Sequence, residues 1–262
     1  MMKQMLHGWV EYVEMFQYIQ SQHGFRIHAS RVVAYPVYMQ TTVRGAAYTT
    51  PIYSLTEAAQ IIRAPATSFA RWAHGHRFPQ RRDGEYGWSE PILSGVRGGR
   101  GYTVPFDALA EGYIVESFRR AGLPMARIRP AVQILRDEIG LEHALLSEQL
   151  KTDGAEILLE NGDRDLIVVR NRQGVFRDAV EQYLQTITYS GGLVESVRLP
   201  TYEGAEVIVD PLRNSGQPTI AKLGVRVEDV VSRIRAGELM SDVADDFGLT
   251  DAEIRSLWVQ AA

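Results

Sequence analysis

Cysteine is absent from the 262 residues of this chain, and the usual signs of an exported protein are missing as well. Without a thiol, the protein forms no disulfide, zinc–thiolate site or iron–sulfur cluster and has no cysteine nucleophile. Residues 1–19 are apolar on one face only, carry Glu11 and Glu14, and lack a small-residue cleavage site. We therefore expect neither a signal peptide nor a membrane span, and we expect a cytoplasmic location.

Sequence motifs of catalysis are also missing. The chain has no nucleophile elbow, Walker motif or Rossmann fingerprint. Asp242, Asp245 and Asp246 have helical spacing, but acidic residues favour a helix start through the helix dipole alone. His74 and His76 have no further metal ligands close by in the sequence, so a phosphate or turn contact is favoured. We expect no enzyme, no catalytic residue, no metal and no cofactor.

The composition is that of an ordinary globular protein, with 45% hydrophobic and 23% charged residues. The length suits at least two domains. The formal net charge of −4 is unevenly distributed: residues 51–150 carry 12 basic and 11 acidic side chains, whereas residues 201–262 carry 6 and 11. Seven arginines lie between residues 63 and 100. A locally basic segment in an acidic chain favours a nucleic-acid partner near the front.

A candidate helix-turn-helix occupies residues 53–80, YSLTEAAQIIRAPATSFARWAHGHRFPQ. Ser54 and Glu57, three residues apart, form a capping box that marks the start of the first helix. Pro65 suits the first turn of the second helix, and Gly75 ends it. The spacing therefore predicts two short helices joined by a tight turn.

A candidate wing follows in residues 90–106, EPILSGVRGGRGYTVPF. Its glycine-rich tip, from Arg97 to Gly101, separates two short β-prone runs, which predicts a hairpin. Apolar residues at helical spacing then predict helices over residues 106–121 and 128–139.

Short β-prone runs at 155–159, 166–169, 186–189 and 193–199, with a helix over 177–184, predict a β-rich connector. Beyond Pro211 the spacing predicts three helices, with Ser241 and Thr250 as caps. The expected fold class is α+β, mainly α. Its expected parts are an amino-terminal amphipathic helix and extension (1–50), a winged helix-turn-helix with following helices (51–150), the β-rich connector (151–205) and a three-helix domain (206–262).

The exposed side of the second helix is the candidate DNA-reading surface, because one α-helix fits the major groove, about 12 Å wide. Thr67, Ser68 and Arg71 are the candidates for contacts with bases or nearby phosphates. The alternative is a helical hairpin with a solvated arginine loop, but capped helices, a basic hairpin and a long helix in this order favour DNA binding. The remaining candidates, which would contact phosphates, are His74, Arg77, Arg81, Arg82, Arg97 and Arg100.

The stretch from Tyr53 to Gly140 resembles the MerR-type winged-helix family. The resemblance lies in SLTEAAQIIRAPATSFARW, GGRGYTV and FDALAEGYIVESFRRAGLPMARIRPAVQILRDEIG. It implies a winged helix-turn-helix that binds DNA. The chain departs from the family by a longer insert between Arg77 and Glu90 and by lacking the long dimerising coiled coil and the cysteine effector site, so sensing of metals by thiols is excluded.

Residues 207–258 resemble the small three-helix domain, formerly of unknown function, that occurs in antitoxins of VapBC-type modules. One departure is a single Gly216 after Asn214 and Ser215, where the family often has two glycines. Together the two resemblances imply a VapB-type antitoxin that represses its own operon at operator DNA and neutralises a PIN-domain ribonuclease toxin. The matching residues are Asp210, Pro211, Gly216, Pro218, Gly224, Arg226, Val227, Gly237, Phe247, Leu249, Thr250 and Ile254.

The last 26 residues carry six acidic side chains against Arg255 alone, so their surface would repel DNA phosphates. This surface is either a partner site or a solvated acidic face. For a docked toxin, the candidate contacts are Asp242, Asp246, Leu257 and Trp258.

A homodimer is expected, and the amphipathic helix over residues 5–19 either packs within the chain or dimerises. Two rival functions stay open at this point. One is a ligand-responsive MerR-like regulator with an effector pocket in residues 150–209. The other is a protein-interaction module with a vestigial DNA-binding domain.

Overall fold

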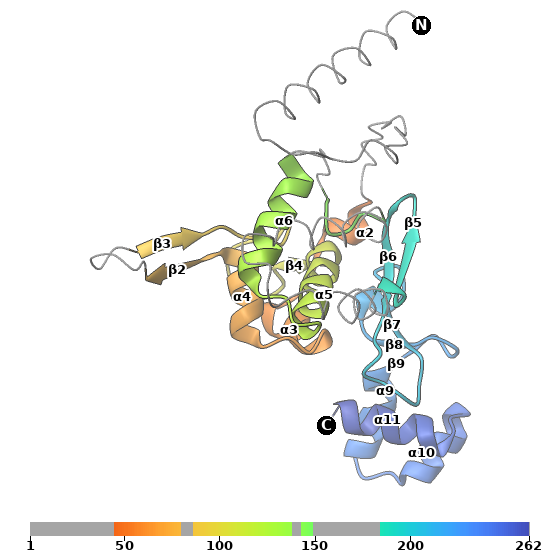
Figure 1. The fold of residues 1–262 in the computed structure, drawn as a ribbon. Helices are drawn as coiled ribbons and strands as arrows, with labels where there is room; N and C mark the ends of the chain where they lie inside the picture. The colour runs from red at the N-terminus through yellow and green to blue at the C-terminus, as the bar shows by residue number, and fades with distance from the viewer. Residues whose placement is uncertain (1–44, 80–85, 138–142, 149–183, 262) are drawn as a thin grey trace, which may run out of the picture. The chain divides into compact units, whose positions relative to one another are not determined.

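The computed structural model describes residues 45–79, 86–137, 143–148 and 184–261, and residues 43–262 form one compact unit (Figure 1). Within the described ranges, no helix is both long and apolar enough to cross a lipid bilayer. Several predictions lie outside these ranges. They are the helix over residues 5–19, the strands over 155–159 and 166–169, the helix over 177–184 apart from its last residue, and the side chains of Arg81 and Arg82.

The predicted helix-turn-helix is confirmed. Ser54 caps its first helix with the expected reciprocal bonds to Glu57. Pro65 lies one position earlier than expected, as the N-cap residue of the second helix, and Gly75 ends that helix with a φ of 72°. The elements are α2 (Ala46–Thr49), β1 (Pro51–Tyr53), α3 (Leu55–Ile61) and α4 (Ala66–His74).

The regular hairpin lies in the segment that we expected to be an insert. Strands β2 (His76–Pro79) and β3 (Tyr86–Ser89) pair antiparallel directly after α4. The predicted hairpin over residues 90–106 is wrong in form: residues 90–103 contain no strand, and only β4 (Val104–Pro105) follows the glycine-rich tip. Strand β4 pairs with β1, and the amide of Thr103, just before β4, donates to the carbonyl of Tyr53 in β1.

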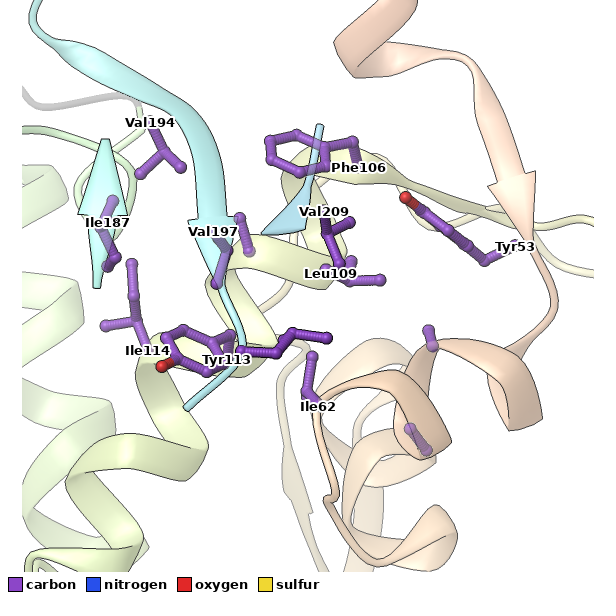
Figure 2. Close-up of a cluster of buried hydrophobic side chains, with 14 of the residues drawn as sticks. Tyr53, Ile62, Phe106, Leu109, Tyr113, Ile114, Ile187, Val194, Val197 and Val209 are labelled. Carbon is purple, nitrogen blue, oxygen red and sulfur yellow. The ribbon is translucent and has the colours of Figure 1, made fainter. Parts of the chain in front are cut away.

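Helix α5 (Phe106–Arg120) is the central element of the fold, and α6 (Met125–Asp137) follows it. All but three of the fifteen residues of α5 are buried, as expected for a helix covered on every side. It packs against α3, α4, β1, β4 and β6. Figure 2 shows the result, a single cluster in which Leu109 and Ile114 of α5 lie among side chains from the helix-turn-helix and from the sheet.

Five short antiparallel strands form one sheet in the order β5-β6-β7-β8-β9. The predicted runs 186–189 and 193–199 are confirmed as β5 and β6. Because β6 pairs with β7, the sheet continues across residue 205, where we expected the connector to end. The strands are β5 (Ile187–Ser190), β6 (Leu193–Arg198), β7 (Val207–Val209), β8 (Thr219–Ile220) and β9 (Val225–Arg226).

The three predicted carboxy-terminal helices are confirmed. Thr250 accepts a bond from the Glu253 amide and Glu253 accepts one from the Thr250 amide, which is the predicted capping box. The prediction that Ser241 caps the second of these helices is wrong. Leu239 occupies the N-cap position, and the Ser241 hydroxyl bonds to Asp242 instead. The helices are α9 (Val227–Arg235), α10 (Met240–Phe247) and α11 (Asp251–Ala261).

Candidate nucleic-acid interface

Helix α4 separates a buried face from an exposed one. Phe69 and Trp72 are buried and contact each other with ring centroids 6.3 Å apart. On the opposite side, Thr67, Arg71 and His74 are exposed. Their spacing of four and three residues puts them on one face of the helix. Two of the three predicted reading residues, Thr67 and Arg71, therefore share an exposed face with His74, while the third, Ser68, is half-buried.

The charge of this surface is positive. No acidic residue lies in the first turn of α4, and Arg71 and His74 lie in its last turn. His76 follows Gly75, and its partial burial, with the nearby Arg129 and Arg71, lowers its pKa below the ordinary value. Burial lowers the pKa of His76 most, and the positive charges of Arg129 and Arg71 lower it further.

The root of the hairpin is tied to the helices around it. The backbone amides of Ile92 and Leu93, just after β3, donate to the carbonyl of Trp72 at 2.9 and 3.3 Å. Arg129 of α6 donates to the carbonyl of Glu90. These bonds attach the segment after β3 to α4 and to α6.

Arg97 and Arg100 lie on an exposed loop rather than on the regular hairpin. The amide of Arg97 donates to the carbonyl of Thr103 at 2.9 Å and so closes the loop. The loop also has a rigid base, because Glu111 of α5 is 0% exposed and accepts bonds from the amide and the hydroxyl of Ser94. Both arginines are thus exposed on a loop that hydrogen bonds close at its base.

The four predicted contacts with a toxin differ in how exposed they are. Leu257 is 0% exposed and belongs to the core, so its role as an exposed anchor is wrong. Asp242 is exposed and Trp258 is half-buried. Asp246 is exposed but pairs with Arg233 at 2.7 Å. The prediction missed two exposed apolar side chains nearby, Leu239 at 68% and Val259 at 69%.

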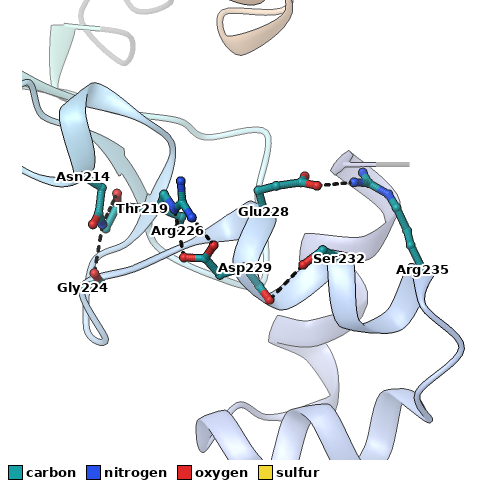
Figure 3. Close-up of polar contacts among 8 residues, drawn as sticks. All are labelled: Asn214, Thr219, Gly224, Arg226, Glu228, Asp229, Ser232 and Arg235. Atoms are coloured by element: carbon teal, nitrogen blue, oxygen red, sulfur yellow. Dashed lines mark hydrogen bonds and ion pairs between the residues drawn. The ribbon is translucent and has the colours of Figure 1, made fainter.

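Polar contacts fix the start of the carboxy-terminal helices (Figure 3). The side-chain amide of Asn214 donates to Thr219 and to the carbonyl of Gly224, at 3.0 and 2.9 Å. Arg226 pairs with Asp229 in the first turn of α9, which lowers the pKa of that carboxyl. The bonds of Asn214 join the turn after β7 to β8 and to the turn before β9, and the Arg226–Asp229 pair lies at the start of α9.

Sequence reasoning also missed the exposed aromatic side chains of the hairpin, Phe78, Tyr86 and Trp88. A signal was present, since the dipeptide Asp83-Gly84 between HRFP and YGWS is a hairpin-turn pattern. Among the described residues, no group of three or more histidine or acidic side chains is placed to hold a metal ion.

These features define the class of the protein, which carries a helix-turn-helix with a cationic exposed helix. Residues 51–132 match a family described as a putative DNA-binding HTH domain, and residues 207–259 match one described as a protein of unknown function, DUF433.

A protein of Mycobacterium tuberculosis (strain ATCC 25618 / H37Rv) named "Putative antitoxin VapB45" is 40% identical over 221 residues, which cover 78% of this chain and 91% of that protein. The chain therefore belongs to the VapB45 family. "Uncharacterized protein Rv2308" of the same organism is 26% identical over 78% of this chain and 87% of its own. The crystal structure of Rv2018 from M. tuberculosis superposes with a TM-score of 0.63 at 35% identity, covering 80% of this chain and 98% of that chain.

Proposed function

We propose that the protein is a DNA-binding antitoxin that represses its own operon and neutralises a toxin by direct binding. The observation that carries the DNA-binding half is the exposed face of α4, where Thr67, Arg71 and His74 lie together above a buried aromatic base. An α-helix of this kind can enter the major groove and present those side chains to base edges. The name of the relative and the helix-turn-helix match support this assignment.

Roles differ among the cations. Arg71 lies on the exposed face of α4 and is proposed to contact a base, whereas Arg77, Arg97 and Arg100 are proposed to contact phosphates. Arg81 and Arg82 are proposed phosphate contacts on their sequence alone. Since a phosphate contact carries no sequence information, these groups differ in their effect on specificity.

Fluorescence anisotropy with the protein's own promoter, and with a scrambled duplex of equal length, tests DNA binding. Arg71→Gln should weaken binding to the promoter by about 1–3 kcal/mol and lower its preference over the scrambled duplex. Arg97→Gln should weaken binding to both duplexes alike. Arg255→Gln, an exposed arginine of α11, is the matched control. Absence of binding to either duplex at low salt would refute the proposal.

The toxin-binding half is proposed for the acidic carboxy-terminal helices, with Asp242, Asp246 and Trp258 as contacts and a PIN-domain ribonuclease as partner. Exposed acids repel DNA phosphates, so this surface suits a protein. Co-purification with a PIN-domain protein encoded beside the gene tests this. Asp242→Lys should weaken the complex, with Asp251→Lys as the exposed acidic control. Light scattering of the free protein tests the proposed homodimer.

A further inference from the structure

The turn between α3 and α4 contains a residue in an uncommon backbone conformation. Arg63 has a φ of 56°, which lies in the left-handed region that favours glycine. Glycine would adopt this conformation without steric cost, yet the position carries a long, charged side chain. A strained backbone at such a residue points to a role for the side chain.

The side chain of Arg63 reaches the carboxy-terminal helices. Its guanidinium donates a hydrogen bond to the backbone carbonyl of Gln260, in the last turn of α11, across 197 residues of sequence. Burial raises the pKa of Tyr202, between β6 and β7, and the nearby positive charge of Arg63 opposes that shift. The turn of the helix-turn-helix is therefore joined to α11 through one side chain.

The end of α11 suits guanidinium groups. The last four carbonyls of a helix have no partner within the helix and carry partial negative charge. Gln260 and Ala261 are the last two residues of α11, and Arg235 of α9 donates to the carbonyl of Ala261 at 2.5 Å. Arg63 and Arg235, from two different parts of the fold, therefore bind neighbouring carbonyls at this helix end.

The backbone of the same turn is held by α5. Arg120, in the last turn of α5, donates to the carbonyl of Arg63 at 2.8 Å and to that of Ile62 at 3.5 Å. The Arg120 side chain also pairs with Glu116, one helical turn earlier, at 3.0 Å. The turn is thus bound at its backbone by α5 and at its side chain by α11.

The turn leads directly into the end of α4 that would enter a DNA groove. Pro65, the N-cap residue of α4, follows Arg63 by two positions, and the exposed Thr67 follows it by four. In a helix-turn-helix, the first residues of the second helix reach the base edges. Phe69 and Trp72 anchor the later part of α4 in the core, so the turn sets the position of its beginning.

We propose that Arg63 is a positioning residue for DNA recognition, which uses the end of α11 as a fixed point to set how α4 enters the major groove. This inference rests on the proposed DNA binding. It makes the acidic carboxy-terminal helices part of the DNA-reading unit, although their own charge is unsuited to contact with phosphates. We expect the effect in sequence preference more than in stability, because polar contacts of exposed side chains contribute little to folding.

Anisotropy of the full-length protein with the promoter duplex and with the scrambled duplex tests the inference. Arg63→Asn introduces a residue that tolerates the left-handed conformation but is too short to reach Gln260. It should lower the preference for the promoter about tenfold, with wild-type affinity for the scrambled duplex and a melting temperature close to wild type. Arg63→Gly should show the same loss, and Arg63→Lys, which keeps the charge and the reach, should retain most of the preference. Arg255→Asn, at an exposed arginine of α11, is the matched control and should behave as wild type.

Hydrogen exchange reads out the link between α4 and α11 itself. Two linked sites affect each other equally, so DNA bound at α4 should be felt at the far end of the contact. The promoter duplex should slow amide exchange in residues 258–261 of the wild-type protein and leave it unchanged in Arg63→Asn. A residue that only stabilises the fold would not produce this difference.

The outcomes separate this inference from the proposed function. If the wild-type protein binds neither duplex, the proposed function fails and the inference fails with it. If Arg63→Asn weakens binding to both duplexes alike, Arg63 is a phosphate contact. If the variant lowers only the melting temperature, or changes nothing, Arg63 does not position α4. Each of these results for the variant overturns the inference and leaves DNA binding in place, and circular dichroism of each variant checks that it is folded.

Discussion

Gly216 is the residue at which two distant parts of the chain meet. The hydroxyl of Tyr53, in the strand before the helix-turn-helix, donates to the carbonyl of Gly216 at 2.7 Å, across 163 residues of sequence. A Cβ at Gly216 would lie 2.1 Å from that hydroxyl, and its φ of +74° disfavours a side chain. Only glycine fits this position, because space and backbone conformation both exclude a larger residue.

Gly216→Ala should therefore lower the free energy of unfolding by about 2–4 kcal/mol through overlap and backbone strain. Gly224→Ala is the matched control, because Gly224 has a similar φ of +68° but nothing within 4 Å of a Cβ. The control should cost about 1 kcal/mol from strain alone. Urea denaturation measures both, and equal losses would contradict the role given to the Tyr53 contact.

Tyr189 should make the stability of the folded protein depend on pH in the alkaline range. Burial, with a smaller effect of Glu148, raises its pKa to about 12, above the ordinary value of 10. The folded state then holds the phenolic proton more tightly than the unfolded state. The contribution of Tyr189 to the free energy of unfolding is therefore fully present below pH 10, and it is lost as the pH rises from 10 to 12.

Tyr189→Phe should reduce the loss of stability between pH 10 and 12, as measured by urea denaturation at each pH. At pH 7 the variant should be close to wild type, because the buried Tyr189 hydroxyl has no hydrogen-bond partner among the described residues. Tyr86→Phe, a change at an exposed tyrosine, is the control and should leave the alkaline loss intact. An unchanged pH profile in Tyr189→Phe would contradict the prediction.

At the scale of elements, α10 and α11 begin differently although their sequences look alike. Thr250 accepts a bond from the Glu253 amide, while Lys222 also pairs with Glu253 at 2.8 Å. Ser241 lies inside α10, where its hydroxyl caps nothing. Thr250→Ala should lower the free energy of unfolding by about 1 kcal/mol, and Ser241→Ala by less than about 0.5 kcal/mol, in thermal denaturation. Equal effects would show that the cap does not stabilise α11.

Much of the element pattern could be predicted because it depends on local chemistry. The capping box of Ser54 and Glu57 and the glycine after α4 act within a few residues, so the sequence alone located the helix-turn-helix. The hairpin was misplaced for a physical reason. The β-prone residues 90–96 find their hydrogen bonds on Trp72 and on Glu111 rather than on a partner strand, and local propensity does not reveal this.

The candidate site was predictable only in part. The spacing placed Thr67, Ser68 and Arg71 on the exposed side of the second helix, and the structure agrees for Thr67 and Arg71, whereas Ser68 is half-buried. The prediction that Leu257 is an exposed partner contact was wrong, because the helical spacing of an apolar residue is the same in a core and at an interface. Which of these it occupies depends on how α9 and α11 pack.

At the scale of the whole molecule, α5 joins the helix-turn-helix to the sheet. Tyr113 on this helix shares a 2.7 Å hydrogen bond with Thr186 beside β5. Since one core serves both parts, residues 45–261 should unfold as one cooperative unit. In single-tryptophan variants that keep either Trp72 or Trp258, urea unfolding should give the same midpoint. Separate midpoints would mean that the carboxy-terminal helices form an independent domain.

The sequence by itself determined the local features: the absence of thiol chemistry, the capping boxes of Ser54 and Thr250, and the contrast between a basic front and an acidic end. Each follows from residue type and short-range spacing. Tertiary structure alone decided which residues of those elements meet. The sheet crosses the expected boundary at residue 205, Gly216 lies against Tyr53, and Trp88 rests on the end of α4. Such contacts join residues far apart in the chain or from different elements, and they form only when the apolar faces around α5 are buried together.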